Sequence, residues 1–274
     1  MDHDREPLPS RVEGLPPLQP EALAVLDEGL QALGLATLPG MTRMGLIDHL
    51  RLLLAWNRSI NLTAIRDPAT AVREHVLDSL TALPVLREAR IETLLDLGSG
   101  GGYPGLPLAL ALPARRALLV ESVGKKATFL TAAAVLATEV LAAGQGRGEV
   151  DVFSGRAEAL AADPRHRERW QAVVARAIAP LAELAEIALP LVARGGILVA
   201  WKRQPLEAEL AAAEPALRQL GGAPAVLWPV GLAGLEDHVL VIVEKLRLTP
   251  ADFPRDPARR RRRPLAAGER LPSP

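Results

Sequence analysis

The chain has 274 residues, of which 49% are hydrophobic and 23% are charged, so it has enough apolar material for a folded core. The absence of cysteine excludes disulfides, thiolate metal sites, iron–sulfur clusters and a cysteine nucleophile, and the five histidines do not form metal-ligand pairs. The 32 basic and 32 acidic residues cancel, no apolar run reaches the roughly 18 residues of a membrane span, and the first residues do not resemble a signal peptide. We therefore expect a soluble, cytoplasmic protein with no metal and no membrane segment.

Residues 1–66 are expected to form a leader and a helical segment. Residues 1–20 contain five prolines and few apolar side chains, which is typical of irregular chain. Leucines then recur at the three- and four-residue spacing of a helix face. This spacing predicts helices over residues 21–33 and 42–56, the second with Thr42 as its N-cap.

Residues 67–247 are expected to form the main domain. Asp67 as N-cap and Pro68 in the first turn predict a helix that continues to residue 86. From residue 92 onward, short apolar runs alternate with helical stretches. The runs predict strands over residues 93–97, 117–121, 150–153, 172–175, 197–201 and 238–244, and helices over 125–143, 180–192 and 206–220. The alternation predicts a Rossmann-like α/β domain with helices on both faces of the sheet, and the last strand could be an antiparallel edge.

A glycine-rich loop follows the first predicted strand. In the sequence DLGSGGGYPG, residues 96–105, the residues Gly98, Gly100 and Gly102 allow the backbone to turn sharply and approach a ligand closely. A helix that starts at Pro104 would point free amide groups at that ligand. Glu121 ends the second strand, where a carboxylate can accept hydrogen bonds from ribose hydroxyls. These features predict a nucleotide-type cofactor, and a glycine turn without a ligand is the alternative.

The loop favours S-adenosylmethionine over NAD. A dinucleotide-binding fingerprint has a third glycine at position 103, which is tyrosine here. Asp96 lies two residues before Gly98, where its charge would repel a pyrophosphate and attract the ammonium group of a methionine moiety. An NAD-dependent reductase remains open as an alternative.

The sequence also limits the methyl acceptor. Methylation at C5 of a pyrimidine needs a cysteine adduct, and the chain has no cysteine. Methylation of an exocyclic amine usually needs an Asn/Asp-Pro-Pro-aromatic motif after the fourth strand, where this chain reads RAIAP. A ring nitrogen such as guanine N7 remains, because it has a lone pair and no proton to remove. Such a transfer depends mainly on alignment and desolvation.

Several motifs together point to one family. They are WNRSINLTAI (56–65), HVLDS (75–79), DLGSGGGYPGLP (96–107), Glu121-Ser122, Lys125-Lys126, GRAE (155–158), Ala175-Arg176-Ala177 and the basic stretch 253–265. This set, which extends over roughly residues 45–265, resembles the ribosomal RNA small-subunit methyltransferase G family, also called glucose-inhibited division protein B. The resemblance implies an enzyme that transfers a methyl group from S-adenosylmethionine to N7 of a guanine in 16S ribosomal RNA.

The resemblance also implies which residues surround the cofactor. They are Gly98, Tyr103, Glu121, Ala157, Glu158 and Arg176, to which the loop and the second strand add Asp96, Gly100, Gly102 and Ser122. Glu158 could instead be an ordinary acid at a helix N-terminus. Arg176 needs a partner at its depth, and a cofactor carboxylate, an RNA phosphate or a structural salt bridge would each serve. His75 and Asp78 are expected to pack and hydrogen-bond where their helix meets the sheet.

Residues 248–274 are expected to form a basic, largely irregular tail. Its arginines are Arg255, Arg259, Arg260, Arg261, Arg262 and Arg263. With an RNA substrate they are expected to contact phosphates, and a solubilising tail is the alternative. Arg156, Arg176 and Lys202 are further candidates for contact with RNA or with the transition state. The expected partner is small-subunit ribosomal RNA or a ribosomal subunit precursor, with no obligate protein partner.

Two other functions share part of this evidence. A methyltransferase with a protein or small-molecule acceptor would have the same fold but no use for the arginine run. A non-catalytic nucleotide- or RNA-binding module would have no use for the glycine loop together with Glu121.

Overall fold

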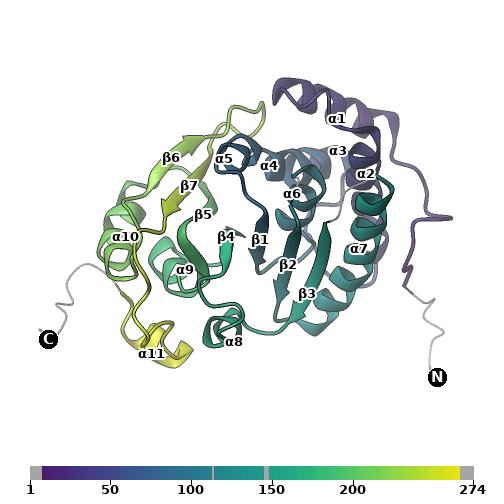
Figure 1. The fold of residues 1–274 in the computed structure, drawn as a ribbon. Coiled ribbons are helices and arrows are strands. Elements are labelled where there is room, and N and C mark those ends of the chain that lie inside the picture. Colours follow the sequence, from purple (N-terminus) through teal and green to yellow (C-terminus); the bar gives the residue numbers. More distant parts are fainter. Residues whose placement is uncertain (1–7, 113, 145–147, 266–274) are drawn as a thin grey trace, which may run out of the picture.

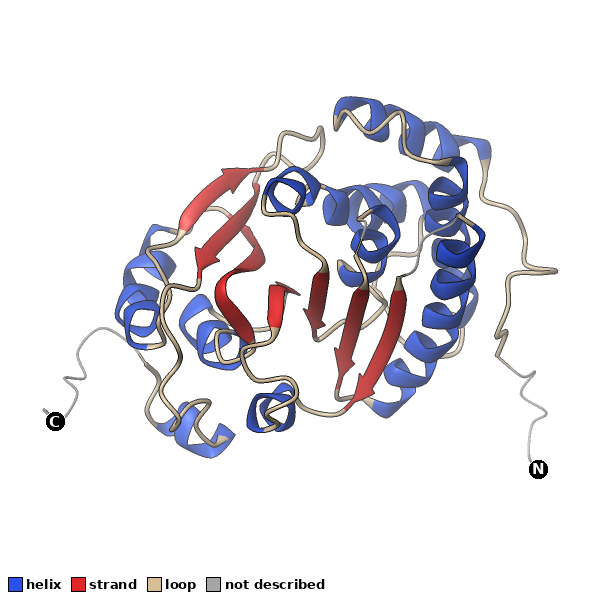
Figure 2. Ribbon diagram, viewed as in Figure 1, coloured by secondary structure: helices blue, strands red, loops and turns tan. Residues whose placement is uncertain are grey.

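The computed structural model describes residues 8–112, 114–144 and 148–265, which form a sheet with helices on both faces (Figures 1 and 2). The strands are β1 Thr93–Leu97, β2 Arg116–Glu121, β3 Glu149–Ser154, β4 Trp170–Arg176, β5 Val192–Arg203, β6 Val226–Pro229 and β7 His238–Glu244. They lie in the order β3-β2-β1-β4-β5-β7-β6. Strands β1 to β5 are parallel, whereas β7 is antiparallel to both β5 and β6. The strand order reverses between β1 and β4, and sheets of this kind bind ligands at the carboxyl ends of such strands.

The helices are α1 Pro20–Ala32, α2 Gly40–Trp56, α3 Pro68–Ala71, the π-helix η1 Val72–Leu77, α4 Asp78–Leu80, α5 Leu83–Glu88, α6 Gly105–Ala111, α7 Gly124–Ala143, α8 Ala157–Ala162, α9 Leu181–Ala188, α10 Glu207–Gln219 and α11 Pro257–Arg262. Asp67 caps α3 as expected, because its side chain accepts a hydrogen bond of 2.7 Å from the Thr70 amide. The predicted N-cap Thr42 was wrong, since α2 begins at Gly40 and the Thr42 hydroxyl donates to Leu110 O. The single helix predicted over 68–86 is instead four short segments, one of them a π-helix.

The strand prediction missed β6 and misplaced the edge of the sheet. All six expected strands are present, and β7 lies between β5 and β6 rather than at the edge. The edge strand β6 has four residues, all of them exposed, and ends in Pro229. A buried apolar run therefore does not mark it, and proline is tolerated there because an edge strand leaves amide groups unpaired.

Alternate residues of each strand supply two separate cores. Leu94 of β1 belongs to the core under α1, α2, α5, α6 and α7, whereas its neighbour Leu95 belongs to the core under α9 and α10. This alternation follows from the two-residue repeat of side-chain direction in a strand. The helices predicted before residue 90 therefore share a core with one face of the sheet.

Helix α7 has the length and apolar composition of a membrane span, contrary to the expectation that no such segment exists. One face of the helix, which includes Phe129, Leu130 and Ala133, is buried. The helix packs against α2, β2 and β3. The buried face of α7 belongs to the core on this side of the sheet.

The C-terminal segment is more ordered than the expected irregular tail. Asp256 caps α11 by accepting hydrogen bonds from the amides of Ala258 (2.8 Å) and Arg259 (3.4 Å). Leu265 is buried in the core that also contains α9 and α10. Residues 266–274 of the tail and residues 1–7 of the leader lie outside the described residues.

Candidate active site

The glycine loop between β1 and α6 has the backbone that its sequence predicts. Gly98, Gly100 and Gly102 have φ angles of 63°, 55° and 85°, in the left-handed region that favours glycine. Gly102 also has a close neighbour, since a Cβ there would lie 2.8 Å from Nε2 of His49. The loop can therefore keep this shape only with glycine at these positions.

Asp96 is buried beside the loop. Its Oδ2 accepts a hydrogen bond of 3.0 Å from the Gly105 amide, which opens α6, while Oδ1 has no partner among the described residues. Burial raises the pKa of Asp96 to about 7, although hydrogen bonds involving Ser99 and Gly105 lower it. An unpartnered, buried carboxylate oxygen of this kind would be satisfied by a cationic ligand group.

Glu121 joins the end of β2 to the glycine loop. Its Oε2 accepts from the Gly100 amide at 3.0 Å and its Oε1 from the Val123 amide at 2.8 Å. A carboxylate oxygen can accept more than one hydrogen bond, so this geometry leaves capacity for ribose hydroxyls. Glu121 therefore belongs to the predicted cofactor site and also holds the glycine loop in position.

The remaining predicted cofactor residues lie at the carboxyl edge of the sheet. Ser122 is exposed at the end of β2, Arg156 is exposed at the start of α8, and Ala157 is half-buried beside it. Sequence reasoning missed two exposed apolar side chains at the same edge, Val123 after β2 and Ile178 after β4. Their signal was an apolar residue two positions after a strand end, where a flat apolar ligand group needs a contact surface.

Glu158 has a structural partner. Its side chain forms an ion pair and a hydrogen bond with Arg260 of α11. Burial alone would raise the pKa of Glu158, but the contact with Arg260 outweighs it and lowers that pKa. The Glu158 side chain links α8 to α11. A contact between Glu158 and the cofactor would therefore have to form while the ion pair with Arg260 is kept.

Tyr103 is buried behind the loop in a stack of aromatic rings. Its ring centroid lies 4.5 Å from that of His49 and 5.0 Å from that of His75, at interplanar angles of 25° and 24°. Burial lowers the pKa of each histidine to about 4, so both imidazoles are neutral at pH 7. His49 also contacts the Gly101 carbonyl oxygen through Nε2, at 2.9 Å. No local sequence pattern indicates this role for His49, because Gly101 lies 52 positions after it in the chain.

Arg176 at the end of β4 has a carboxylate partner within the chain. Its guanidinium donates to Asp78 Oδ2 at 3.1 Å and to the Glu74 carbonyl oxygen at 2.7 Å. The Asp78 carboxylate also contacts His238 Nδ1 at 3.0 Å through its other oxygen. The structural salt bridge foreseen for Arg176 is present, and His75 and Asp78 have the packing and hydrogen-bonding roles that were expected.

A polar pocket of about 460 Å³ lies next to this cluster. Its lining residues are Glu74, His75, Asp78, Arg176, Ala177, Trp201, Lys202, Arg203 and His238. Lys202 is engaged, since its Nζ donates to Ala179 O at 2.7 Å and to Glu209 Oε1 at 2.6 Å. Arg203 is more exposed and lies 3.8 Å from carboxylate oxygens of Glu74 and Asp237.

The six predicted RNA-binding arginines divide into two groups. Arg255 binds Glu186 through Nε at 2.8 Å and Nη2 at 2.7 Å, and Arg260 binds Glu158. Both arginines are buried, so the expectation that they face RNA is not matched by their positions. Arg259, Arg261, Arg262 and Arg263 are exposed. Arg260 is the buried arginine of the short helix α11, whereas Arg255 precedes that helix.

The site fits S-adenosylmethionine better than a metal. Within the described ranges, no group of three or more histidine, aspartate and glutamate side chains could hold a metal ion. The unpartnered oxygen of Asp96 suits an ammonium group, Glu121 suits a ribose, and the positive φ at Gly98 keeps the loop free of side chains.

Comparison with known proteins agrees with this assignment. Residues 43–227 match the family model described as rRNA small subunit methyltransferase G. The chain is 41% identical over 213 residues to the ribosomal RNA small subunit methyltransferase G of Roseiflexus sp. (strain RS-1). The aligned region covers 78% of this chain and 87% of the relative. It is 38% identical over 232 residues to that of Symbiobacterium thermophilum, with 84% and 93% covered. An O-methyltransferase structure from Bacillus cereus in complex with SAH has 16% identity and a TM-score of 0.42 over 85% of this chain and 94% of that one, too distant for any functional inference.

Proposed function

The chain belongs to the rRNA small subunit methyltransferase G family, so it is an S-adenosylmethionine-dependent methyltransferase of small-subunit ribosomal RNA, and we propose that its acceptor atom is N7 of a guanine in 16S ribosomal RNA. The proposal combines the family with the chemistry of the acceptor. A C5 acceptor would need a cysteine, which the chain lacks, and the RAIAP segment after β4 lacks the motif typical of amine acceptors.

The observation that carries the proposal is the shared boundary between the glycine loop and the polar pocket. Arg176 and Ala177 line the pocket, and the next residue, Ile178, lies 3.1 Å from the position that a Cβ would take at Gly98. The end of β4 therefore separates the cofactor loop from the pocket by a single layer of residues. A base in that pocket would lie beside a cofactor bound at the loop, and alignment of this kind is the main requirement of a methyl transfer.

The side chains have distinct proposed roles. Asp96 holds the ammonium group of the methionine moiety and Glu121 holds the ribose. When it is bound, S-adenosylmethionine supplies a methyl group on a sulfonium, which is the electrophile of the reaction. Asp78 keeps Arg176 in place at the pocket wall, and no side chain has to remove a proton because guanine N7 carries none.

Transfer of radioactive methyl from S-adenosylmethionine to small ribosomal subunits that lack the modification tests this function. We expect label in 16S ribosomal RNA, at a guanine that becomes sensitive to strand cleavage after borohydride reduction and aniline treatment, a reaction specific to N7-methylated guanine. Label on another atom would refute the N7 acceptor. No label, together with no binding of S-adenosylhomocysteine, would refute the proposed function as a whole.

We also propose that the single chain acts in the cytoplasm without an obligate protein partner. Its substrate is then either free 16S ribosomal RNA or a subunit precursor. Methylation of both by the purified chain, measured side by side, distinguishes the two substrates. A requirement for an added protein fraction would contradict the absence of a partner.

A further inference from the structure

We propose that a second pocket, between the leader and α2, binds one nucleotide of the ribosomal RNA, with its phosphate on the side of the pocket that carries Arg58 and Arg66. This inference rests on the proposed function and adds an RNA contact away from the polar pocket beside Arg176, which we call the acceptor pocket. The pocket has a volume of about 380 Å³, which is within the range of sites for small ligands. We call it the leader pocket.

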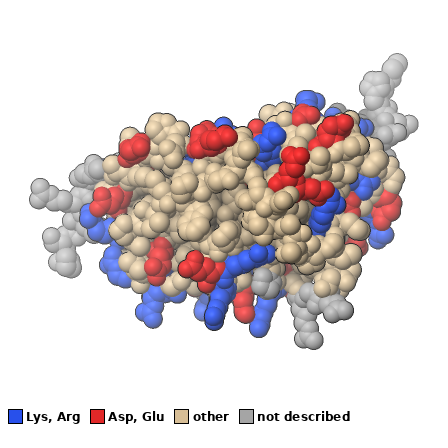
Figure 3. Space-filling view, turned by 90° about the horizontal axis from the view of Figure 1, so that it is seen from above, with Lys and Arg blue, Asp and Glu red and all other residues tan. Residues whose placement is uncertain are grey.

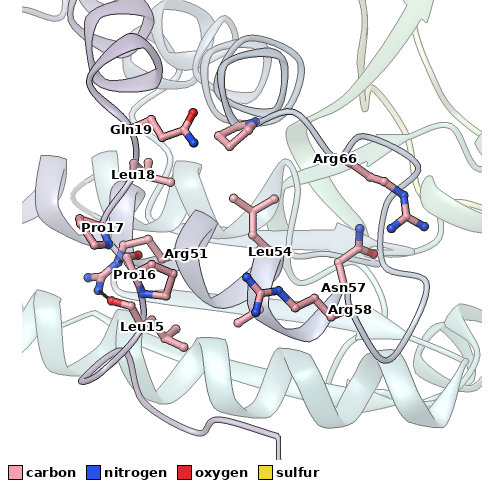
Figure 4. A pocket seen from close by; sticks show the side chains of 12 residues that line it. Leu15, Pro16, Pro17, Leu18, Gln19, Arg51, Leu54, Asn57, Arg58 and Arg66 are labelled. Carbon is pink, nitrogen blue, oxygen red and sulfur yellow. Dashed lines mark hydrogen bonds between the residues drawn. The ribbon is translucent and has the colours of Figure 1, made fainter.

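The walls of the leader pocket are fixed by hydrogen bonds. One wall is formed by leader residues 15–19, and the opposite wall by α2 and the loop after it (Figure 4). Arg51 of α2 holds the leader, since its Nε donates to the Pro16 carbonyl oxygen at 3.0 Å. Asp48 forms an ion pair of 2.7 Å with Arg51 and neutralises it. The cavity therefore exists without a ligand and needs little ordering when one binds.

Arg58 and Arg66 supply the charge of the leader pocket. Both side chains are exposed, and neither has a hydrogen bond or ion pair with the rest of the described chain. Figure 4 shows them at the same cavity, on either side of Asn57. The lining contains three arginines and no aspartate or glutamate, and Asp48 neutralises only Arg51. Two guanidinium groups without an ion-pair partner at one cavity match the charge of a phosphodiester.

The rest of the lining suits a nucleoside rather than a bare anion. It consists largely of the apolar side chains Leu15, Pro16, Pro17, Leu18 and Leu54. A base can lie against such a surface while its phosphate reaches the arginines, and contacts of this type bind single-stranded RNA with little sequence preference. Since the chain acts on RNA, we assign the occupant to an RNA strand and not to an acidic peptide.

A chain of hydrogen bonds connects the leader pocket to the acceptor pocket. Asn57 fixes the loop that carries both arginines, because its Oδ1 accepts from the Leu62 amide at 2.9 Å and its Nδ2 donates to the Thr63 carbonyl oxygen at 3.0 Å. The Thr63 hydroxyl in turn contacts His75 Nε2 at 2.8 Å, and His75 lines the acceptor pocket. The loop over residues 57–66 therefore lies between the two pockets, where an RNA strand could contact both.

The double variant Arg58→Ala/Arg66→Ala tests the leader pocket. We expect the affinity for 16S ribosomal RNA to fall about tenfold, and the slope of log affinity against log salt concentration to become less steep by about one to two. KM for the RNA should rise with kcat at saturating RNA unchanged, because neither arginine touches the reacting atoms. Binding of S-adenosylhomocysteine should not change. Arg58→Lys/Arg66→Lys should restore most of the affinity, since lysine also binds phosphate as a point charge.

Arg169→Ala/Arg194→Ala is the matched control. These two arginines are also exposed and lie near the amino ends of β4 and β5, at the opposite edge of the sheet from the glycine loop. The inference is overturned if Arg58→Ala/Arg66→Ala binds RNA with wild-type affinity and salt slope, or if the control loses as much affinity. Failure of the proposed function is a different result, in which the wild-type chain itself binds no S-adenosylhomocysteine and methylates no RNA.

Discussion

Asp96 lies at the end of β1 with 1% of its surface exposed, and one of its carboxylate oxygens has no partner within the described chain. Burial raises its pKa to about 7 from an ordinary value of 3.8. Between pH 3.8 and about pH 7 the Asp96 carboxyl is protonated in the folded chain and ionised in the unfolded chain. The contribution of Asp96 to stability therefore decreases as pH rises through this window and is least favourable above pH 7. Such a cost is typical of a residue kept for ligand binding.

Asp96→Asn should separate stability from cofactor binding. Asparagine keeps the acceptor for the Gly105 amide and carries no charge, so we expect a higher free energy of unfolding at pH 8. One pKa unit corresponds to about 1.4 kcal/mol, which sets the gain at about 4 kcal/mol at most. At pH 3.5 the gain should be small, because Asp96 is then protonated in the folded chain and mostly protonated in the unfolded chain. Urea unfolding at the two pH values measures the stability, and calorimetry with S-adenosylhomocysteine should show weaker binding. A destabilised variant with unchanged binding would contradict both roles of Asp96.

His49 makes a pH-dependent contribution of the opposite sign. Burial lowers its pKa to about 4, whereas the unfolded chain binds a proton near pH 6.5. Its contribution to stability is thus complete above about pH 6.5 and is lost as pH falls toward 4. His49→Gln should flatten the profile of unfolding free energy in this window by up to about 3 kcal/mol. Urea unfolding between pH 4 and 7.5 measures it, and a profile as steep as that of the wild type would show that His49 does not stay neutral.

At the scale of elements, α11 is attached to the protein body by two arginine–carboxylate pairs. Glu186 of α9 is buried, and it accepts hydrogen bonds from the Arg255 amide, Nε and Nη2 at 2.9, 2.8 and 2.7 Å. Arg260 extends the attachment to Glu158 of α8. These pairs bring the C-terminal segment against α8 and α9, so part of a segment that looks like a disordered basic tail has a fixed position.

Glu186→Ala should destabilise the chain by about 3–5 kcal/mol, because it removes the buried carboxylate that accepts three hydrogen bonds from the buried Arg255. Replacing both partners, as in Glu186→Leu/Arg255→Met, should cost much less, since both charges of the pair are removed together. Urea unfolding measures both variants. Arg261→Ala is the control and should change the unfolding free energy by no more than about 0.5 kcal/mol, because Arg261 is exposed. A small effect of Glu186→Ala would mean that the pair is not closed in solution.

The elements also show what sequence could and could not predict. Buried parallel strands were predictable because both faces are covered, which produces continuous apolar runs such as residues 93–97. The short, exposed β6 has no such signal. The π-helix η1 and the stack of His49 on Tyr103 depend on side chains far apart in the sequence, and no local pattern encodes them. In the candidate site, the glycine loop and Glu121 could be predicted because they lie close together in the sequence. The carboxylate partners of Arg255 and Arg260 could not be predicted, because they lie 69 and 102 positions away.

For the whole molecule, the neutral net charge conceals an uneven distribution. On the face in Figure 3, acidic and basic side chains are mixed around the rim and the centre is largely uncharged. Two of the regions with exposed arginines that have no ion pair are the leader pocket, with Arg58 and Arg66, and the outer side of the C-terminal segment. A polyanion would then be held by these two regions rather than by a uniformly basic surface.

Replacing the four exposed arginines, Arg259, Arg261, Arg262 and Arg263, with alanine tests the second region. Each phosphate contact on a single strand changes the salt slope of binding by about 0.7, so four contacts would reduce the slope by at most about 3. We expect weaker binding to 16S ribosomal RNA, a shallower salt dependence and unchanged binding of S-adenosylhomocysteine. Arg255 and Arg260 stay in place because they attach α11 to the body, so the variant should keep the wild-type midpoint of unfolding. Titrations of labelled RNA at 50 to 300 mM salt measure the slope, and an unchanged slope would assign these arginines to solubility alone.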